Sequence, residues 1–246
     1  MALAGHVLHT FVKAGISQAC RLRKDIVISM KIIELSDVTF GYDEAEPPVL
    51  AHFNLAIEKG TCIVIEGDNG SGKTTLFRII NGLSFPQKGK FLFDGIEINE
   101  KYLKDSRNAK LFHKRIGYLF QNPDVMLFNA KVYDEIAFGP RQMGMTEEEV
   151  KRRTQDCMRI FDLETLADKA PYHLSGGQKK KTALAAVMSL NPEVIVLDEP
   201  FAGLDQKSQS MLTAFIEDLK KAGKTLLIAT HNPDVKEKLA DVTISL

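Results

Sequence analysis

A glycine-rich stretch at residues 67–74 has the composition and spacing of a phosphate-binding loop. It reads GDNGSGKT, which fits the pattern G-x-x-x-x-G-K-[ST], and it lies between a strand-like and a helix-like segment. Glycines there let backbone N–H groups turn toward phosphate oxygens, and the helix N-terminus adds a partial positive charge. We expect Lys73 to reach the β- and γ-phosphates of a nucleotide and the Thr74 hydroxyl to bind Mg²⁺. The alternative, a glycine-rich turn with a solvated lysine, fits this context less well. The residues expected to contact the nucleotide are Gly67, Asp68, Asn69, Gly70, Ser71, Gly72, Lys73, Thr74 and Thr75.

Two acids follow the apolar run at residues 194–197. The run reads VIVL, as a strand buried on both faces should, and it places Asp198 and Glu199 at its carboxyl end. Ligands bind at that end of the strands in open α/β sheets. We expect Asp198 to hold Mg²⁺, directly or through water, and Glu199 to polarise an attacking water as general base. A pair of solvated acids is the alternative.

Three further residues carry weaker signals. Gln121 follows the strand-like residues 116–120 and can contact both Mg²⁺ and an attacking water, although glutamines in turns are mostly solvated. His231 ends the run LLIAT and can donate to the γ-phosphate, although a histidine there is more often an ordinary capping residue. Tyr42 can stack on adenine or can simply be an aromatic side chain of a surface turn.

The elements that must position these residues alternate between strands and helices. Alternating or β-branched residues predict strands, and apolar residues at helical spacing predict helices. Thr146 with Glu149 predicts a capping box at the start of one helix. This alternation indicates an α/β fold with a parallel sheet, and residues 122–188 read as an inserted helical subdomain. The predicted strands are 31–40, 50–57, 61–66, 90–98, 194–197 and 225–230, and the predicted helices are 74–81, 146–161, 178–190 and 206–222.

Composition excludes several classes of protein. The 246 residues contain 32 lysines and arginines against 32 acids, so the basic excess typical of nucleic-acid binders is missing. Cys20, Cys62 and Cys157 form no metal or disulfide pattern, which fits a reducing cytosol. No apolar run approaches the roughly 20 residues needed to span a bilayer. If the protein works at a membrane, other chains must hold it there.

Residues 1–29 differ from the rest of the chain. Their basic residues follow an apolar part, the reverse of a secretory signal. A targeting or membrane-surface helix is one interpretation. We favour the other, in which Met30 is the natural start and the preceding residues are an extension, because a strand begins at Lys31.

Taken together, residues 30–246 resemble the ATP-binding subunit of an ABC transporter. Six motifs occur in the family's order: GDNGSGKT, LFQNPD, LSGGQ, VIVLDEP, AGLD and the ATH that ends in His231. The resemblance implies a P-loop NTPase (RecA-like) α/β core with an antiparallel β part and an inserted helical subdomain. It also implies ATP hydrolysis with Mg²⁺, and a catalytic set of Glu199, His231, Gln121 and Lys73 with Thr74, Gln121 and Asp198 at the metal.

The family's architecture gives a role to the LSGGQ turn at residues 174–178, which has no acid or base of its own. Two subunits are expected to pair head to tail, as a homodimer or a heterodimer, so that each LSGGQ closes over the other chain's ATP. By resemblance Ser175 and Gly177 touch the γ-phosphate and Asp205 lines the dimer seam. Three lysines at 179–181 oppose the dipole of the helix that follows, so we expect either an anionic partner or a solvated face. The residues expected to act across the dimer are Ser175, Gly176, Gly177, Gln178 and Asp205.

A narrower resemblance is to the energy-coupling factor and cobalt-importer ATPases, carried by residues 121–128 and 132–140. Such subunits drive uptake of vitamins or of cobalt and nickel ions through integral membrane subunits, from the cytoplasmic face of the cell membrane. Met126 departs from that group, which commonly has a glutamine there, and the chain stops at Leu246 inside an expected strand. Residues 125–128 can form either a contact to a membrane partner or part of the core.

Two other functions remain open at this point. One is a soluble ABC-type ATPase acting on ribosomes or DNA, although the two modules or the long coiled-coil insert usual there are not present. The other is the low-activity half of a heterodimeric ATPase, against which Glu199 and His231 argue. The sequence does not identify the transported solute.

Overall fold

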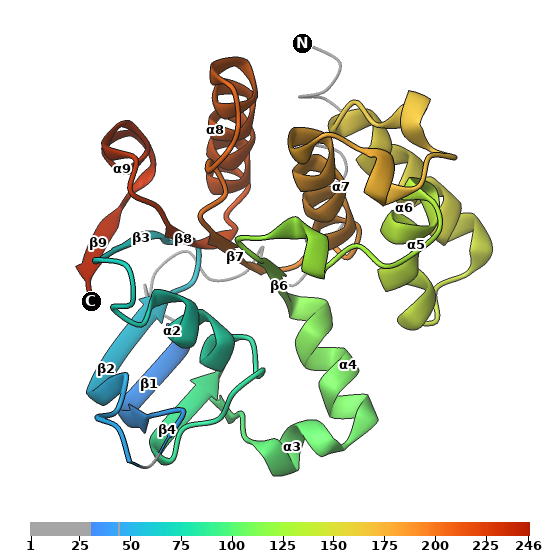
Figure 1. Ribbon diagram of the computed structural model, residues 1–246. Helices are drawn as coiled ribbons and strands as arrows, with labels where there is room; N and C mark the ends of the chain where they lie inside the picture. Colours follow the sequence, from blue (N-terminus) through green and yellow to red (C-terminus); the bar gives the residue numbers. More distant parts are fainter. Residues whose placement is uncertain (1–30, 44) are drawn as a thin grey trace, which may run out of the picture.

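The structure is a computed structural model that describes residues 31–43 and 45–246, and the predictions for residues 1–29 lie outside this part of the chain. Its strands form an antiparallel and a parallel sheet (Figure 1). The antiparallel sheet has the order β2-β1-β4-β5, and the parallel sheet has the order β6-β7-β8-β3-β9. The strands are β1 (Lys31–Phe40), β2 (Leu50–Glu58), β3 (Cys62–Glu66), β4 (Lys88–Phe93), β5 (Ile96–Glu97), β6 (Ile116–Leu119), β7 (Val194–Asp198), β8 (Thr225–Ala229) and β9 (Val242–Ser245).

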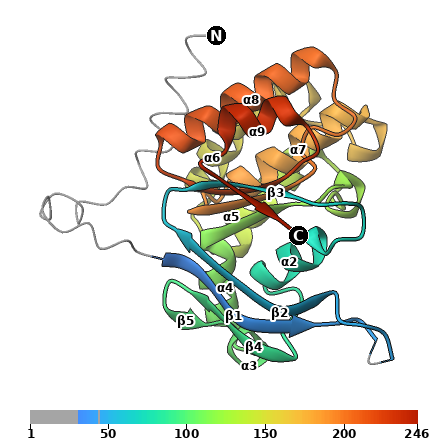
Figure 2. The same cartoon turned by 90° about the vertical axis from the view of Figure 1, so that its left-hand side faces the viewer.

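Nearly every residue of β3, β7 and β8 is buried, which explains their continuous apolar runs. Side chains on one face of the parallel sheet join one apolar core with α5, α6, α7 and α8, whereas those on the other face join a second core with α2 and the antiparallel sheet. Figure 2 shows these layers, with α8 and α9 on one side and β1, β2 and β4 on the other. The parallel sheet is therefore covered on both faces.

In the described part of the chain, the helices lie at the four places where the sequence predicts them and at four others. The helices are α2 (Lys73–Ile80), α3 (Glu100–Lys104), α4 (Ser106–Arg115), α5 (Val132–Gln142), α6 (Glu147–Ile160), α7 (Gly176–Met188), α8 (Gln206–Lys221) and α9 (Pro233–Leu239). Of these, α3, α4 and α9 were not predicted, and α5 was predicted only as part of the helical subdomain at residues 122–188. In α4 only Phe112 is buried, so the helix has no apolar stripe to read. The segment between β6 and β7 is helical, with 3₁₀ turns at Pro123–Val125, Glu164–Leu166 and Pro171–His173.

Two local predictions need correction. The single strand expected at 90–98 is a hairpin of β4 and β5, because Asp94 and Gly95 both adopt positive φ angles and turn the chain. At the start of α6, the Thr146 hydroxyl accepts a hydrogen bond from the Glu149 N–H at 3.3 Å, as predicted. The Glu149 carboxylate, however, lies 4.0 Å from the guanidinium groups of Arg152 and Arg153, so the capping box forms in only one direction.

Arg115, the last residue of α4, joins the two sheets. Its guanidinium donates to Asp94 at 2.6 Å, on the β4–β5 hairpin, and to Glu193 at 3.0 Å, just before β7. It also lies over the Phe93 ring, 4.9 Å from the centroid. Burial opposes ionisation of Glu193, but hydrogen bonds and charge from Arg115 and Lys59 bring its pKa below the ordinary value. This ion pair therefore stabilises the folded state when Glu193 is ionised.

We predict that Arg115→Met lowers the free energy of unfolding at pH 7 by about 1–2 kcal/mol, as expected for charge-assisted bonds that are partly exposed. A carboxyl whose folded-state pKa is depressed contributes stability above its unfolded pKa and loses it as the pH falls through the folded pKa. The difference between wild type and variant should therefore shrink below the ordinary Glu193 pKa of 4.5. Urea unfolding at neutral and acidic pH measures both quantities.

Lys104→Met is the matched control, because Lys104 pairs with Glu100 at 3.0 Å on the exposed surface of α3. Its cost should stay below about 0.5 kcal/mol. A pH-independent cost of Arg115→Met would contradict the role assigned to Glu193.

Candidate functional site

A cleft of about 500 Å³ opens at the carboxyl edge of the parallel sheet. Because β3, β6, β7 and β8 pair in parallel, the segments that follow them meet at this edge. The phosphate loop follows β3, Gln121 follows β6, Glu199 follows β7 and His231 follows β8. The cleft is lined by Tyr42, Val49, Asn69, Gly70, Gly72, Lys73, Thr74, Thr75, Gln121, Asp198, Glu199 and His231.

The phosphate loop wraps around a buried lysine ammonium group. Lys73 Nζ donates to the carbonyl oxygens of Gly67 at 2.6 Å and Asp68 at 2.9 Å. Gly72 has a φ of 104° and caps α2 without a side chain, and a Cβ on Gly67 would lie 2.5 Å from Ser71 Oγ. Positive charge and a helix N-terminus thus lie together where an anion can bind.

Asp198 forms a buried hydrogen-bonded group with Thr74 and Tyr118. The residue is 2% exposed, and its Oδ2 atom accepts from Thr74 Oγ1 at 2.9 Å and from the Tyr118 hydroxyl at 3.2 Å. Burial raises the pKa of Asp198, and the bonds from Thr74 and Tyr118 and the charge of Lys73 partly oppose that rise. Carboxylate and hydroxyl oxygens are ligands that Mg²⁺ accepts in proteins.

Glu199 has a left-handed backbone, with a φ of 45°. Its N–H donates to the Ala229 carbonyl at 3.0 Å, and its Oε1 atom lies 3.3 Å from His231 Nε2. Burial raises the pKa of Glu199, and the charge of His231 lowers it. A non-glycine residue in this conformation is strained by about 1–3 kcal/mol, as is common at functional sites. Because the Glu199 carboxylate and the His231 ring lie together in the lining of the cleft, this pair can hold a water or a proton there.

Tyr42 and Gln121 both belong to the lining of the cleft. The Tyr42 hydroxyl lies 3.1 Å from Thr75 Oγ1, and its exposed ring packs edge-on against Phe40 with centroids 5.1 Å apart. The ring is thus held at one edge with a face open to solvent, as a stacking platform requires.

The LSGGQ turn lies elsewhere. Among the residues that the structure describes, neither 175–178 nor Asp205 lines the cleft. Ser175 and Gln178 form a reciprocal capping box, so α7 begins at Gly176, two residues before the predicted start. Nothing lies within 4 Å of a Cβ built on Gly176. The turn is therefore bare and open, and Asp205 caps α8 by accepting from the Ser208 N–H at 2.7 Å.

The three lysines of α7 find partners within the chain, so a fully solvated face is the wrong interpretation. Lys179 lies 2.7 Å from Asp124, and Lys181 lies 3.7 Å from Asp162. Lys180 is buried, and its Nζ donates to the carbonyl oxygens of Glu199 and Ala202. Acceptors from other segments thus compensate cations that oppose the helix dipole.

Sequence reasoning missed Tyr118 and Lys180. A tyrosine in a buried strand needs a polar partner for its hydroxyl, and that requirement was the available signal for Tyr118. For Lys180 the signal was its unfavourable place in the first turn of a helix. In neither case does the sequence identify the partner, which lies 80 residues away for Tyr118 and 19 and 22 residues away for Lys180.

Neither a membrane-spanning helix nor a cluster of metal-binding side chains occurs within residues 31–43 and 45–246. No helix in this part of the chain has the length and apolar character to span a bilayer. No group of three or more His, Cys, Asp or Glu side chains in it could hold a metal ion. A site with few protein ligands suits Mg²⁺, which usually takes one or two carboxylates together with substrate phosphates.

Comparison with known proteins gives consistent matches. The family model described as ABC transporter matches residues 50–202. The nickel import ATP-binding protein LarO of Lactiplantibacillus plantarum is 44% identical over 195 residues, which cover 79% of this chain and 81% of LarO.

Two solved structures share the fold over most of the chain. The structure of cbiO1 from Clostridium perfringens, part of the ABC transporter complex cbiONQ, has a TM-score of 0.75 and 34% identity, covering 87% of this chain and 84% of cbiO1. A dimeric post-hydrolysis state of the ATP-binding cassette MJ0796, bound to ADP and Pi, has a TM-score of 0.79 and 29% identity, covering 87% of this chain and 94% of that one. The fold predicted from the sequence is thereby confirmed.

Proposed function

Because this chain belongs to the ATP-binding proteins of ABC transporters and is an ATPase, we propose that its ATP hydrolysis drives import of a transition-metal ion or a vitamin through partner membrane subunits. The relatives named for nickel import and for the cbiONQ complex support this solute class. In this proposal the chain works at the cytoplasmic face of the membrane, where the membrane subunits hold it.

One observation carries the proposal that this ATPase works as a pair of chains: the cleft and the LSGGQ turn of one chain are separate. The phosphate loop, Asp198, Glu199, Gln121 and His231 share a cleft, whereas Ser175 to Gln178 lie outside its lining. A turn that is bare and already capped internally is suited to contact a ligand held by another chain. We propose that two copies, or this chain and a similar one, close around two ATP molecules, each between one phosphate loop and the other chain's LSGGQ.

Lys73 and the loop N–H groups bind the phosphates in this proposal. The Lys73 ammonium exchanges its bonds to the carbonyls of Gly67 and Asp68 for phosphate oxygens. The oxygen atoms of Thr74, Asp198 and Gln121 suit Mg²⁺, whose chemical contribution is to neutralise charge on the phosphates. Tyr118 donates to Asp198 and holds the carboxylate in place.

Glu199 is the proposed general base and His231 its neighbour at the γ-phosphate. Glu199 accepts a proton from water as the water attacks phosphorus, and the bond to the β,γ-bridging oxygen breaks. His231, 3.3 Å from the Glu199 carboxylate, orients that carboxylate and donates to the phosphoryl group. Gln121, which follows the neighbouring strand β6, positions the water. The raised pKa of Glu199 makes it a stronger base than a solvated carboxylate.

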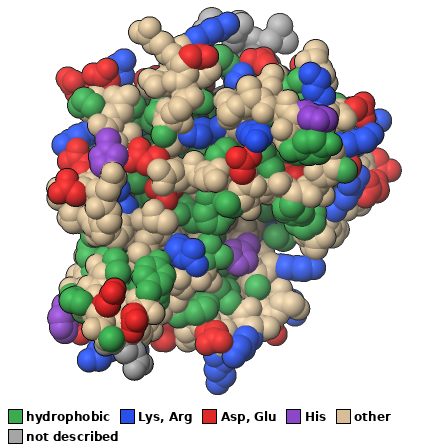
Figure 3. Space-filling model, viewed as in Figure 1, with side chains coloured by type: hydrophobic (Ala, Val, Ile, Leu, Met, Phe, Trp, Pro, Cys, Tyr) green, Lys and Arg blue, Asp and Glu red, His purple; other side chains and the backbone are tan. Residues whose placement is uncertain are grey.

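The loop after β6 is the proposed contact to a membrane subunit. Val125 and Phe128 are 69% and 67% exposed, whereas Met126 and Leu127 pack against the core. Hydrophobic side chains gather across the middle of this face of the molecule (Figure 3). Buried Glu135 fixes the loop by accepting from the N–H groups of Phe128 at 3.0 Å and Asn129 at 2.7 Å. An exposed apolar tip on a rigid loop suits docking.

We predict that Glu199→Gln keeps nucleotide affinity but lowers kcat by at least about 100-fold, because an amide does not accept the proton of water. Lys73→Ala should instead weaken nucleotide binding, since it removes a cation from the phosphates. Calorimetry measures the affinity and phosphate release measures the rate. Wild-type turnover in Glu199→Gln would contradict the assignment of the base.

Mixing two inactive variants tests whether LSGGQ acts across the dimer. Lys73→Ala breaks a chain's own phosphate loop, and Ser175→Arg blocks the turn that it lends to its neighbour. Random subunit exchange makes half the dimers mixed, each with one intact site of two, so a homodimer should recover roughly a quarter of wild-type ATPase activity if its sites act independently. Exchange is verified with differently tagged chains. Zero recovery after verified exchange would mean that LSGGQ serves its own chain's nucleotide.

The proposed contact between the loop after β6 and a membrane subunit can also be tested by substitution. Phe128→Glu should abolish co-purification with the membrane subunits while leaving nucleotide affinity unchanged, because a charge replaces an exposed apolar contact. Ile96→Glu is the matched control, since Ile96 is a 45% exposed apolar residue on β5 of the antiparallel sheet. Normal assembly of Phe128→Glu would reject this docking surface.

A further inference from the structure

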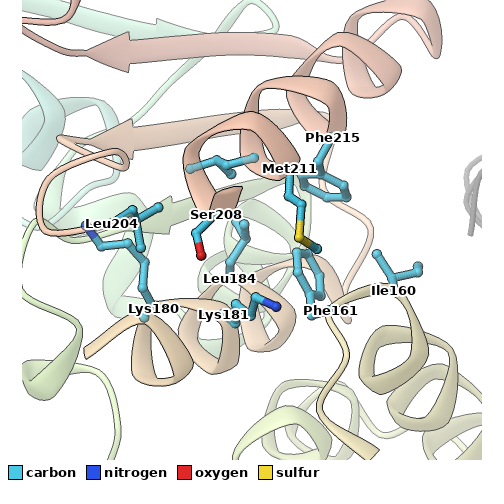
Figure 4. A pocket seen from close by; sticks show the side chains of 11 residues that line it. Ile160, Phe161, Lys180, Lys181, Leu184, Leu204, Ser208, Met211 and Phe215 are labelled. Carbon is cyan, nitrogen blue, oxygen red and sulfur yellow. The ribbon is translucent and has the colours of Figure 1, made fainter. Parts of the chain in front are cut away.

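Lys180 connects the LSGGQ helix α7 to the segment that follows the catalytic strand β7. Its Nζ donates to the carbonyl oxygens of Ala202 at 2.7 Å and Glu199 at 3.2 Å. The residue is 6% exposed, so these are bonds of a desolvated ammonium group to backbone acceptors. Figure 4 shows the side chain leaving α7 and running toward Leu204.

The packing on one side of the Lys180 side chain is incomplete. A cavity of about 60 Å³ lies between α7, α8 and the end of α6, with Lys180 and Leu204 in its wall. The rest of the wall is mostly apolar and includes Phe161, Leu184 and Met211 (Figure 4). A void removes packing contacts that would otherwise hold two elements in register. The polar bonds of Lys180 therefore act together with the apolar packing of Phe201 against α7 in setting the position of the turn at residues 199–202.

The turn that Lys180 holds contains the strained residue of the site. Glu199 has a φ of 45°, and its carbonyl oxygen accepts from the Ala202 N–H at 3.2 Å as well as from Lys180. On its other side, the Glu199 N–H donates to Ala229 at 3.0 Å. Both peptide groups that flank the Glu199 Cα atom are thus fixed, and so is the direction in which its carboxylate leaves the backbone. A strained conformation persists only where such bonds over-determine it.

We propose that Lys180 is a positioning residue for ATP hydrolysis: it holds the turn at residues 199–202 so that the Glu199 carboxylate faces the cleft, and it ties this turn to α7. The inference rests on the proposed role of Glu199 as base. It adds a link within one chain between the residue that acts on its own nucleotide and the helix that carries LSGGQ.

Lys180→Met tests the proposal in the full chain, because methionine keeps the apolar stem and removes the donor. We expect kcat to fall by about 10-fold to 100-fold, as misplacement of a catalytic group does, with nucleotide affinity within about twofold of wild type. Lys180→Arg keeps donors that reach the same carbonyls and should recover part of the rate. Lys181→Met is the control, since Lys181 lies 3.7 Å from exposed Asp162 and should leave kcat unchanged.

Combination with Glu199→Gln separates positioning from general loss of structure. If Lys180 acts through the Glu199 carboxylate, Lys180→Met costs little further activity in the Glu199→Gln background, measured by single-turnover hydrolysis. An equal fold-loss in both backgrounds would overturn the proposal, as would wild-type kcat in Lys180→Met. Wild-type turnover of Glu199→Gln alone would instead refute the base assignment, and this inference with it.

Discussion

Parallel pairing of four buried strands is the constraint on which the rest of the structure depends. Hydrogen bonding of β6, β7, β8 and β3 in one direction places all four carboxyl ends at a single edge. The direction of the strands alone therefore brings residues that are far apart in the chain to the same edge, with no separate contact needed for each pair. A sheet buried on both faces needs two covering layers, and the antiparallel sheet with α2 supplies one while α5 to α8 supply the other. The cleft lies where these layers leave the edge open.

The sequence predicts the parts of this arrangement whose causes are local. The phosphate loop and the apolar run before Asp198 are contiguous motifs, and the structure brings them into one cleft. Helix α4 was not predicted because Phe112 is its only buried residue, so its sequence shows no apolar stripe. The roles of Tyr118 and Lys180 were not predicted for another reason. Both side chains donate hydrogen bonds to acceptors on other segments, which only the fold brings near.

The early start of α7 shows how a local signal can be misread. Two glycines suggest a loop, because glycine weakens helices by about 1 kcal/mol each. The capping box between Ser175 and Gln178 nevertheless places both glycines inside the first turn. Side chains there would cover the helix N-terminus, so glycine leaves its N–H groups open to a ligand at a cost in helix stability. In the phosphate loop glycine has another cause, because Gly67 and Gly72 have positive φ angles and a Cβ on either would crowd neighbouring atoms of the chain.

Three lysines at a helix N-terminus would ordinarily destabilise α7, and the way each is compensated shows what the helix connects. Lys179 pairs with Asp124 in the loop that carries the exposed Val125 and Phe128. Lys180 binds the carbonyls of the turn that begins at Glu199. Lys179 and Lys180 thus anchor α7 to the loop with the apolar tip on one side and to the turn beside the cleft on the other. The electrostatic cost at the start of this helix is therefore offset by the same contacts that hold α7 to two other regions of the chain.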